Sequence, residues 1–334
     1  TPLAMFIAQP LCGMLADRFG YQRVLLTASA FGTISYLAYL QTGGFSWVLG
    51  VTVMMSLFYN TIQPVLDSLS LQLAKENPGY SYGSLRIAGA AGWSVTGIIT
   101  GQTIDLLSLD MIFVISAASM GLVFLSALFL NHSGAEQQAG SNNTMEGASK
   151  LLRDRKLLFF LLCVVLVSVG STTIWNFYSL YMKENGASAS LVGFGLSFQG
   201  LCELPFFWFS ARIIARIGLK PALVFTVAVT AVRLLLYGII RTPELAIAIE
   251  LLQGISWSLF WVVCVEYVNR MVSPDRLATG QSLLYAAYYG VGAIAGNFWT
   301  GYLSELALPL TTIFLMNAAG TTVVALVIWH WVWN

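Results

Sequence analysis

Long apolar segments recur along the whole chain and constrain its fold more than any other feature. Eleven of them approach or exceed 20 residues, the length that an α-helix needs to cross about 30 Å of hydrocarbon. Only 9% of the 334 residues are charged and 57% are hydrophobic, whereas a soluble domain has about 25% charged residues. The sequence therefore predicts an all-α polytopic membrane protein with the lipid bilayer as its main partner.

The distribution of basic residues predicts how these segments are oriented. The expected spans are 1–16, 24–42, 47–74, 83–103, 111–130, 157–181, 189–213, 221–240, 244–270, 277–302 and 309–333. Twelve of the 16 Lys and Arg residues fall in one set of alternate loops and two in the opposite set. The positive-inside rule places the twelve in the cytoplasm of a multi-pass protein of the cell membrane. Because the first span begins without a methionine, we expect an N-terminal piece to be missing.

A change of composition divides the spans into two groups. Residues 131–156 are rich in Asn, Ser, Gly, Gln and charges, which is typical of a linker. We expect a helical half at 1–130, a cytoplasmic linker at 131–156 and a second half at 157–334. A glycine followed closely by basic residues occurs after an equivalent span in each half, at Gly20 and at Gly218. This repeat favours duplicated halves.

Polar residues inside the apolar segments indicate a binding site at mid-membrane. Ser56, Asn60, Gln63 and Asp67 are spaced by four, three and four residues, so they lie on one face of a single helix. Arg86 opens the next apolar run, and Trp93 lies two turns further along the same face. Each charge costs about 2.5–3.5 kcal/mol to insert and usually marks a solute or ion path.

The second half adds further polar positions. Asn176 belongs to a stripe of small polar residues, and Gln253 and Trp257 share a face of the tenth span. The aromatic members of such stripes are equally well explained by ordinary packing. We include Asn60, Gln63, Asn176, Gln253 and Trp257 with Asp67, Arg86 and Trp93 among the predicted substrate-binding residues.

Elimination selects a carboxylate for proton coupling. Glu244 lies beside Arg241, and Glu266 lies four residues from Arg270, so both have ordinary ion-pair explanations. Glu203 lies well inside its span, and Arg233 on the following span is the cation that could displace its proton. We therefore expect Glu203 and Arg233 to carry coupling. Glu250 remains the alternative.

No pattern in the sequence requires a cofactor, a metal or a nucleic-acid partner. The four cysteines lack metal-ligand or C-x-x-C spacing, and the net charge is only +1. No H-E-x-x-H or G-x-S-x-G pattern supports an intramembrane enzyme. A non-transporting sensor on a transporter fold is a further alternative, although such sensors commonly carry a long soluble extension.

The first loop resembles the loop motif of the major facilitator superfamily, G-x-L-a-D-r-x-G-r-k. Its matching residues include Gly13, Asp17, Arg18, Gly20 and Arg23, while Gln22 replaces a common basic residue. The resemblance implies two six-helix halves, of which the first helix is the missing one. It says nothing about the substrate.

The binding positions resemble one group within that superfamily. Pro64-x-x-Asp67 and the segment Gly83 to Trp93 are similar to the sugar-binding helices of the oligosaccharide:proton symporters of the lactose permease kind, and of the related nucleoside:proton and phenylpropionate permeases. Arg233 looks like that group's ninth-helix arginine. Gln253 and Ser256 stand where that group has a coupling histidine and carboxylate, so the proton route is left open.

These features together favour a proton-coupled symporter of a small polar solute, sugar or glycoside-like, that works by alternating access as a monomer. Asp67 would accept hydrogen bonds from solute hydroxyls, Arg86 would donate as a planar fork, and Trp93 would offer an aromatic face. The alternatives are a permease for a nucleoside or aromatic acid, and a drug or metabolite efflux antiporter of the same fold.

Overall fold

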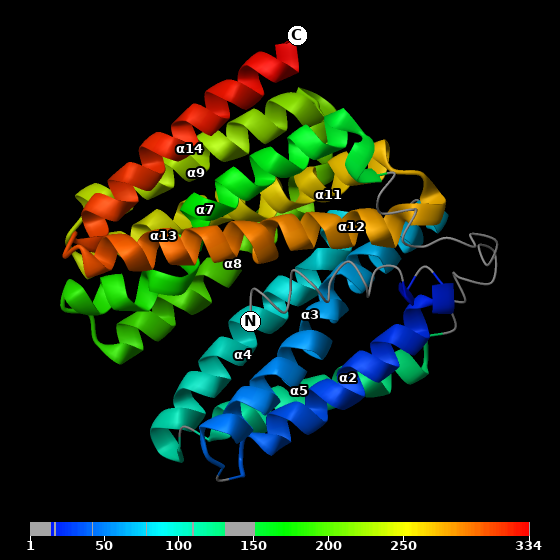
Figure 1. The fold of residues 1–334 in the computed structure, drawn as a ribbon, viewed down its shortest axis with the longest axis vertical. Coiled ribbons are helices and arrows are strands. Elements are labelled where there is room, and N and C mark those ends of the chain that lie inside the picture. Colours follow the sequence, from blue (N-terminus) through cyan, green and yellow to red (C-terminus); the bar gives the residue numbers. More distant parts are fainter. Residues whose placement is uncertain are drawn as a thin grey trace. The chain divides into compact units, whose positions relative to one another are not determined.

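Every regular element in the part of the chain that the structure describes is a helix (Figure 1). The structure is a computed structural model and describes residues 15–333, except 17, 42, 78, 109 and 131–150. The predicted span at 1–16 therefore lies outside the described residues except for 15 and 16, and the predicted linker at 131–156 does so except for 151–156. Contacts between Cα atoms divide the chain into two compact units, each of which contains residues from both predicted halves. The division into halves stays a prediction.

The first unit comprises residues up to 76, residues 102–161 and residues 268–291. Its main helices are α2 (Tyr21–Ala38), α3 (Phe45–Glu76), α5 (Met111–Leu128) and α12 (Leu277–Tyr285). Helix α2 packs against α3 and α5, and α12 packs against α3. Their contact is apolar, with Leu25, Val65 and Met120 among the buried residues. Helix α12 continues through a π-helical turn, η4 (Ala286–Gly292).

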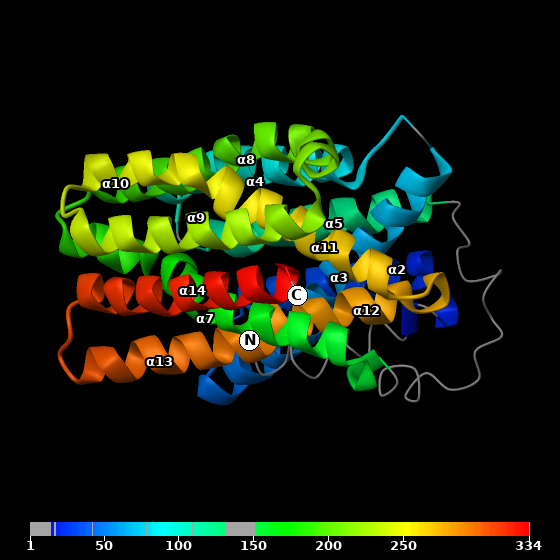
Figure 2. The same ribbon diagram turned by 90° about the horizontal axis from the view of Figure 1, so that it is seen from above.

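The second unit comprises residues 77–101, 162–267 and those from 292 onward. Its helices are α4 (Tyr82–Leu106), α7 (Arg155–Glu184), α8 (Ala189–Ile217), α9 (Leu219–Ile239), α10 (Pro243–Ile249), α11 (Phe260–Met271), α13 (Ala293–Glu305) and α14 (Leu310–Trp333), some of which extend past the unit's boundaries. Helices α9 and α14 run side by side (Figures 1 and 2). Tyr181, Tyr237 and Phe314 join them to α7 through ring contacts at 5.1–5.5 Å.

Seven helices in the described residues are long and apolar enough to cross a membrane. They are Phe45–Glu76, Met111–Leu128, Arg155–Glu184, Leu191–Ile217, Leu219–Ile239, Pro243–Met271 and Leu310–His330. The sequence also predicts spans at 24–42, 83–103 and 277–302, and residues 24–38, 83–103 and 277–302 are helical as well. They contain more Gly, Ser, Thr and Gln, which lowers their apolar character. An all-helical, multi-pass membrane fold is thus confirmed.

The two glycines of the predicted repeat have the same backbone conformation. Gly20 has φ 89° and ψ 150° directly before α2, and Gly218 has φ 84° and ψ 159° directly before α9. Residues with a side chain rarely adopt a positive φ, so glycine suits both positions. The repeat seen in the sequence therefore corresponds to a repeated turn.

Glycines also allow α4 and α8 to pack closely within the second unit. A Cβ atom on Gly83 would overlap the Phe207 carbonyl oxygen and the Ser210 hydroxyl. A Cβ atom on Gly200 would overlap the Ser94 hydroxyl and lie 3.3 Å from the Ala90 carbonyl oxygen. The contact nearer the start of α4 lies nearer the end of α8, so the two helices pack antiparallel.

We predict that Gly83→Ala destabilises the protein by about 1–3 kcal/mol, because the new methyl group meets backbone that cannot move away freely. Gly89→Ala is the matched control on the same helix, since its Cβ would meet nothing within 4 Å. Thermal unfolding in detergent measures the difference. Equal unfolding temperatures for Gly83→Ala and the parent protein would contradict the close packing of α4 on α8.

Candidate functional site

A fully buried ion pair lies at the centre of the second unit. Arg233 on α9 donates from Nη2 to Oε2 of Glu250 at 2.5 Å, and the two side chains are 3% and 0% exposed. Tyr237, one turn after Arg233, donates its hydroxyl to the other oxygen of Glu250. Gln199 on α8 also hydrogen bonds to Glu250. The carboxylate is thus held by a cation and by neutral donors from two helices.

An irregular helix positions the partners of Arg233. Helix α10 ends at Ile249 and is followed by a 3₁₀ turn, η1 (Glu250–Leu252), and by a π-helical turn, η2 (Gly254–Leu259), before α11 begins. A Cβ on Gly254 would overlap the Cys202 carbonyl oxygen and the Phe206 ring of α8. The glycine therefore lets this helix approach α8 closely, at the residue next to Gln253.

Gln253 connects the ion pair to a second carboxyl group. Its Oε1 accepts from Nη1 of Arg233, and its Nε2 donates to Oε1 of Glu203 at 2.9 Å. Nη1 also donates to the Ser256 hydroxyl at 3.3 Å. Gln253 is 0% exposed and Glu203 is 9% exposed. The structure therefore brings Glu203, Arg233, Glu250 and Gln253 into one buried network.

The network differs from the predicted contacts in how Arg233 is used. The sequence suggests Arg233 as the cation for Glu203, with Glu250 as the alternative. In the structure Arg233 pairs with Glu250 directly and reaches Glu203 only through Gln253. Elimination along the chain missed this pairing because Arg233 and Glu250 lie 17 residues apart on different helices.

Arg86 lies close to the same carboxyl group. On α8, Gly200 packs against Ala90, and Phe207 packs against Gly83. The antiparallel register therefore sets Arg86 opposite the turn of α8 that begins at Glu203, and its guanidinium acts electrostatically on that carboxyl. Arg86 is half-buried.

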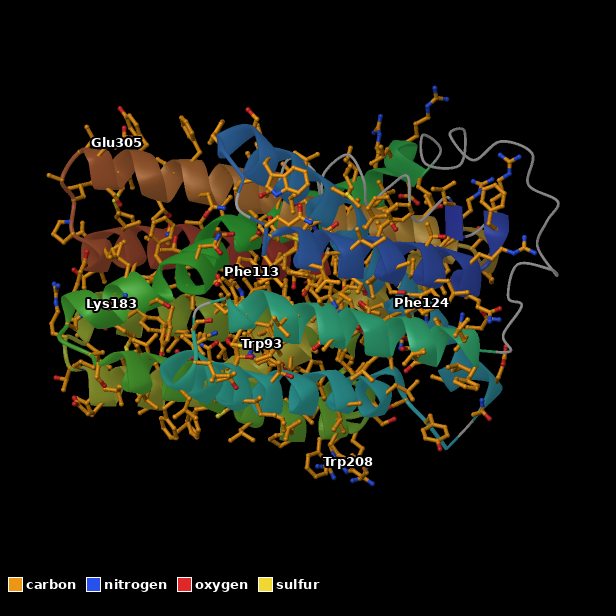
Figure 3. The ribbon with its side chains drawn as sticks, turned by 90° about the horizontal axis from the view of Figure 1, so that it is seen from below. Trp93, Phe113, Phe124, Lys183, Trp208 and Glu305 are labelled. Atoms are coloured by element: carbon orange, nitrogen blue, oxygen red, sulfur yellow. The ribbon has the colours of Figure 1, made fainter. Side chains whose placement is uncertain are left out.

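Trp93 is the exposed aromatic residue of the predicted binding set. Its side chain is 57% exposed and is marked in Figure 3. The Cδ1 atom of its indole would lie 3.1 Å from a Cβ on Gly200. The ring is thus anchored beside α8 with much of its surface open, as a stacking residue requires.

Trp257, by contrast, is a packed residue. It is 7% exposed, meets Trp175 edge to face at 5.2 Å, and stacks on Trp261 at 5.1 Å. Its ring faces are therefore largely covered by other aromatic rings. Asn176 is exposed and donates to Oδ1 of Asn297 at 2.7 Å, which joins α7 to α13.

Asp67 lies in the first unit and is only 1% exposed. The hydroxyl of Tyr285, the last residue of α12, donates to its Oδ2 at 2.6 Å. Asn60 is buried on the same helix and donates to the Ser56 carbonyl oxygen, and Gln63 is half-buried. Asp67 and Arg86 belong to different units, so their predicted joint action on a solute stays a prediction.

The loop motif is only partly within the described residues. Gly13 and Asp17 lie outside them, Gly20 precedes α2, and Arg18 and Arg23 are exposed. Among the described residues no group of three His, Cys, Asp or Glu side chains is arranged to hold a metal ion.

Two tyrosines are partners that the predicted site residues do not include. Tyr237 and Tyr285 donate to Glu250 and Asp67 respectively. The signal for Tyr237 was its position four residues after Arg233, on the same helix face. Tyr285 shares a helix face with Gln281 and Tyr288, but nothing in the sequence pairs it with Asp67, which is 218 residues away.

Apolar helices that enclose a buried ion pair are typical of multi-pass membrane transporters, and comparisons with known proteins show that the chain is one. A model of the MFS_1 like family matches residues 1–315, so the chain belongs to this family of the major facilitator superfamily. Family membership places the chain among transporters of the cell membrane rather than among enzymes.

Individual relatives share about a quarter of their aligned residues or fewer with the chain. The chain is 27% identical to the uncharacterized transporter YwbF of Bacillus subtilis, over 92% of the chain and 78% of that protein. It is 26% identical to the maltose permease of Geobacillus stearothermophilus, over 91% of the chain and 77% of the permease. A crystal structure of a point mutant of the nucleoside transporter NupG has the same fold, with a TM-score of 0.77 at 20% identity over 98% of the chain and 88% of NupG.

We predict that Glu250→Gln destabilises the protein by about 3–5 kcal/mol, because it leaves a buried guanidinium without its counter-charge. Arg233→Leu should cost less, since a carboxyl group can bind a proton whereas a guanidinium cannot lose one. The double variant Arg233→Leu/Glu250→Leu should recover part of the loss. Thermal unfolding in detergent compares the three, and a double variant less stable than both singles would contradict the pairing.

We also predict that Tyr285→Phe lowers the free energy of unfolding by about 1–3 kcal/mol, the cost of removing the donor from a buried acceptor. Tyr178→Phe is the control, because the Tyr178 hydroxyl is buried without a hydrogen-bond partner among the described residues. Removal of the Tyr178 hydroxyl should leave the free energy of unfolding unchanged, since it breaks no such hydrogen bond. Equal effects of the two substitutions on the unfolding temperature would show that the Asp67 contact adds no stability.

Proposed function

We propose that the chain is a proton-coupled symporter of a small polar solute, sugar or glycoside-like, that works by alternating access. The observation that carries this proposal is the buried network of Glu203, Gln253, Arg233 and Glu250. Ionisable groups inside membrane segments are costly, and they usually mark a substrate or proton path. A purely passive channel for a neutral solute would not need them.

The two carboxyl groups of the network have different roles in this proposal. Glu250 is balanced by Arg233 and held by Tyr237, so it serves as a permanent counter-charge. Glu203 accepts a hydrogen bond from the neutral amide of Gln253, whereas Arg233 pairs with Glu250. A carboxyl group in that setting can exist in a neutral, protonated form without leaving Arg233 unpaired, so Glu203 carries the proton.

Solute recognition is proposed for Asp67, Arg86 and Trp93. Arg86 supplies a half-buried planar donor beside Glu203, and Trp93 supplies an open ring on the same helix. A guanidinium next to an aromatic face suits a sugar, whose hydroxyls accept hydrogen bonds and whose C–H face is apolar. The resemblance to maltose permease supports this choice.

A nucleoside or an aromatic acid is the alternative solute class. The exposed ring of Trp93 would stack on a base or a phenyl ring as readily as on a sugar. An efflux antiporter would show the opposite direction of proton coupling. Uptake of labelled maltose, uridine and 3-phenylpropionate into proteoliposomes, with an inward, an outward or no proton gradient, distinguishes these classes. Accumulation of none of them under either gradient direction would contradict the proposed solute classes.

We predict that Glu203→Gln abolishes uphill accumulation of the transported solute and preserves its exchange across the membrane. Glutamine imitates the protonated, solute-binding form but cannot release a proton. The measurement is counterflow compared with gradient-driven uptake in the same proteoliposomes. If the Glu203→Gln protein still accumulates solute against its gradient, Glu203 is not the coupling group.

A further inference from the structure

Gln253 lies between a group that only donates hydrogen bonds and a group that only accepts them. The guanidinium of Arg233 has only N–H donors, and the ionised carboxyl of Glu203 has only acceptors. The amide must therefore turn its oxygen to Arg233 and its nitrogen to Glu203, as the structure shows. A flipped amide would place donor against donor and acceptor against acceptor, at a buried position where water does not replace the lost bonds.

The fixed amide restricts the chemistry of Glu203. The nitrogen of a carboxamide donates hydrogen bonds and does not accept them. Oε1 of Glu203 accepts from that nitrogen at 2.9 Å, and the carbonyl oxygen of a neutral acid is a better acceptor than its hydroxyl oxygen. The hydrogen bond therefore favours the proton on Oε2, which leaves Oε1 as the carbonyl oxygen of the neutral acid.

We propose that Gln253 is a positioning residue, whose amide is oriented by Arg233 and selects Oε2 of Glu203 as the oxygen that binds and releases the proton. The inference rests on the proposed function, in which Glu203 is the coupling carboxyl group. It assigns Gln253 a role in proton coupling instead of the solute contact that its sequence position suggests.

The charged groups around Glu203 act on the carboxyl group as a whole. Arg86 faces it from α4, and Arg233 acts on it electrostatically from α9. Glu250 on η1 is taken up by Arg233 and Tyr237. Tyr178 on α7 interacts electrostatically with the Arg233–Glu250 pair, and Cys202 is the chain neighbour of Glu203. The hydrogen bond from Nε2 of Gln253, in contrast, is directed at a single oxygen, Oε1.

Polarisation strengthens the effect. An amide whose oxygen accepts from a cation becomes a better N–H donor, because hydrogen bonds in a chain polarise one another. The guanidinium thus acts on Glu203 through Gln253 while it stays paired with Glu250. Movement of α9 relative to α8 would break this connection and release Oε1.

Infrared spectroscopy of the reconstituted protein tests the assignment without any solute. The C=O band of protonated Glu203 is identified at acid pH as the band that Glu203→Gln removes. In Gln253→Leu we expect this band to shift to higher wavenumber, because its carbonyl oxygen loses a hydrogen bond. Gln253→Asn, whose side chain is one methylene shorter and cannot span both partners, should shift it similarly if the leucine variant does not fold. Ser256→Ala removes the other neutral contact of Arg233 Nη1 and should leave the band in place.

The outcomes separate this inference from the proposed function. An unchanged band in folded Gln253→Leu or Gln253→Asn overturns the role of Gln253, whatever the transport assay shows. A shifted band together with Glu203→Gln protein that still accumulates solute supports the positioning role and overturns the coupling role of Glu203. Absence of any band that depends on Glu203 overturns both.

Discussion

A guanidinium that cannot lose its charge is buried in the second unit, and neighbouring groups supply a counter-charge and neutral acceptors to its two terminal nitrogens. Arg233 on α9 is 3% exposed, contacts the irregular helix from 243 to 271 directly, and interacts electrostatically with Glu203 of α8 and Tyr178 of α7. Its charge is balanced by Glu250, and its remaining Nη1 hydrogens are directed to Gln253 and Ser256. Because the loss of Glu250 would leave a bare buried charge, α9 and η1 must keep their relative positions.

Departures from regular helix geometry place the polar groups that the network needs. Gln253 is followed directly by the π-helical turn η2, and Tyr285 is followed directly by the π-helical turn η4. Each of these residues donates to a carboxyl group on another helix of its own unit, Gln253 to Glu203 and Tyr285 to Asp67. Single π-helical turns occur frequently at functional sites, since they redirect side chains without ending the helix. The coincidence at two positions indicates that these turns serve the polar contacts.

Small residues provide the complementary kind of contact. The α4–α8 pair is held by Gly83 and Gly200, where backbone meets backbone, and Gly254 brings η2 onto α8 in the same way. In a membrane, where lipid is as apolar as leucine, close packing and interhelical hydrogen bonds replace the hydrophobic effect as the basis of helix association. The register that these glycines impose is what sets Arg86 beside Glu203. The placement of Arg86 beside Glu203 therefore depends on packing at positions that carry no chemistry themselves.

Much of the fold could be predicted from the sequence, because a span is a local property: about 20 apolar residues must form a helix to satisfy their own backbone in lipid. The helices at 45–76, 111–128 and 219–239 appear within a few residues of their predicted limits. The residue types of the site were also evident, since a charge inside an apolar run is conspicuous wherever it packs. Which charges meet was not evident. Arg233 and Glu250 are 17 residues apart, Gln253 and Glu203 are 50 apart, and Tyr285 and Asp67 are 218 apart. Their pairing depends on helix rotation, on the π-helical turns and on the glycine contacts. None of these produces a repeating pattern in the sequence, so only the tertiary structure decided which groups meet.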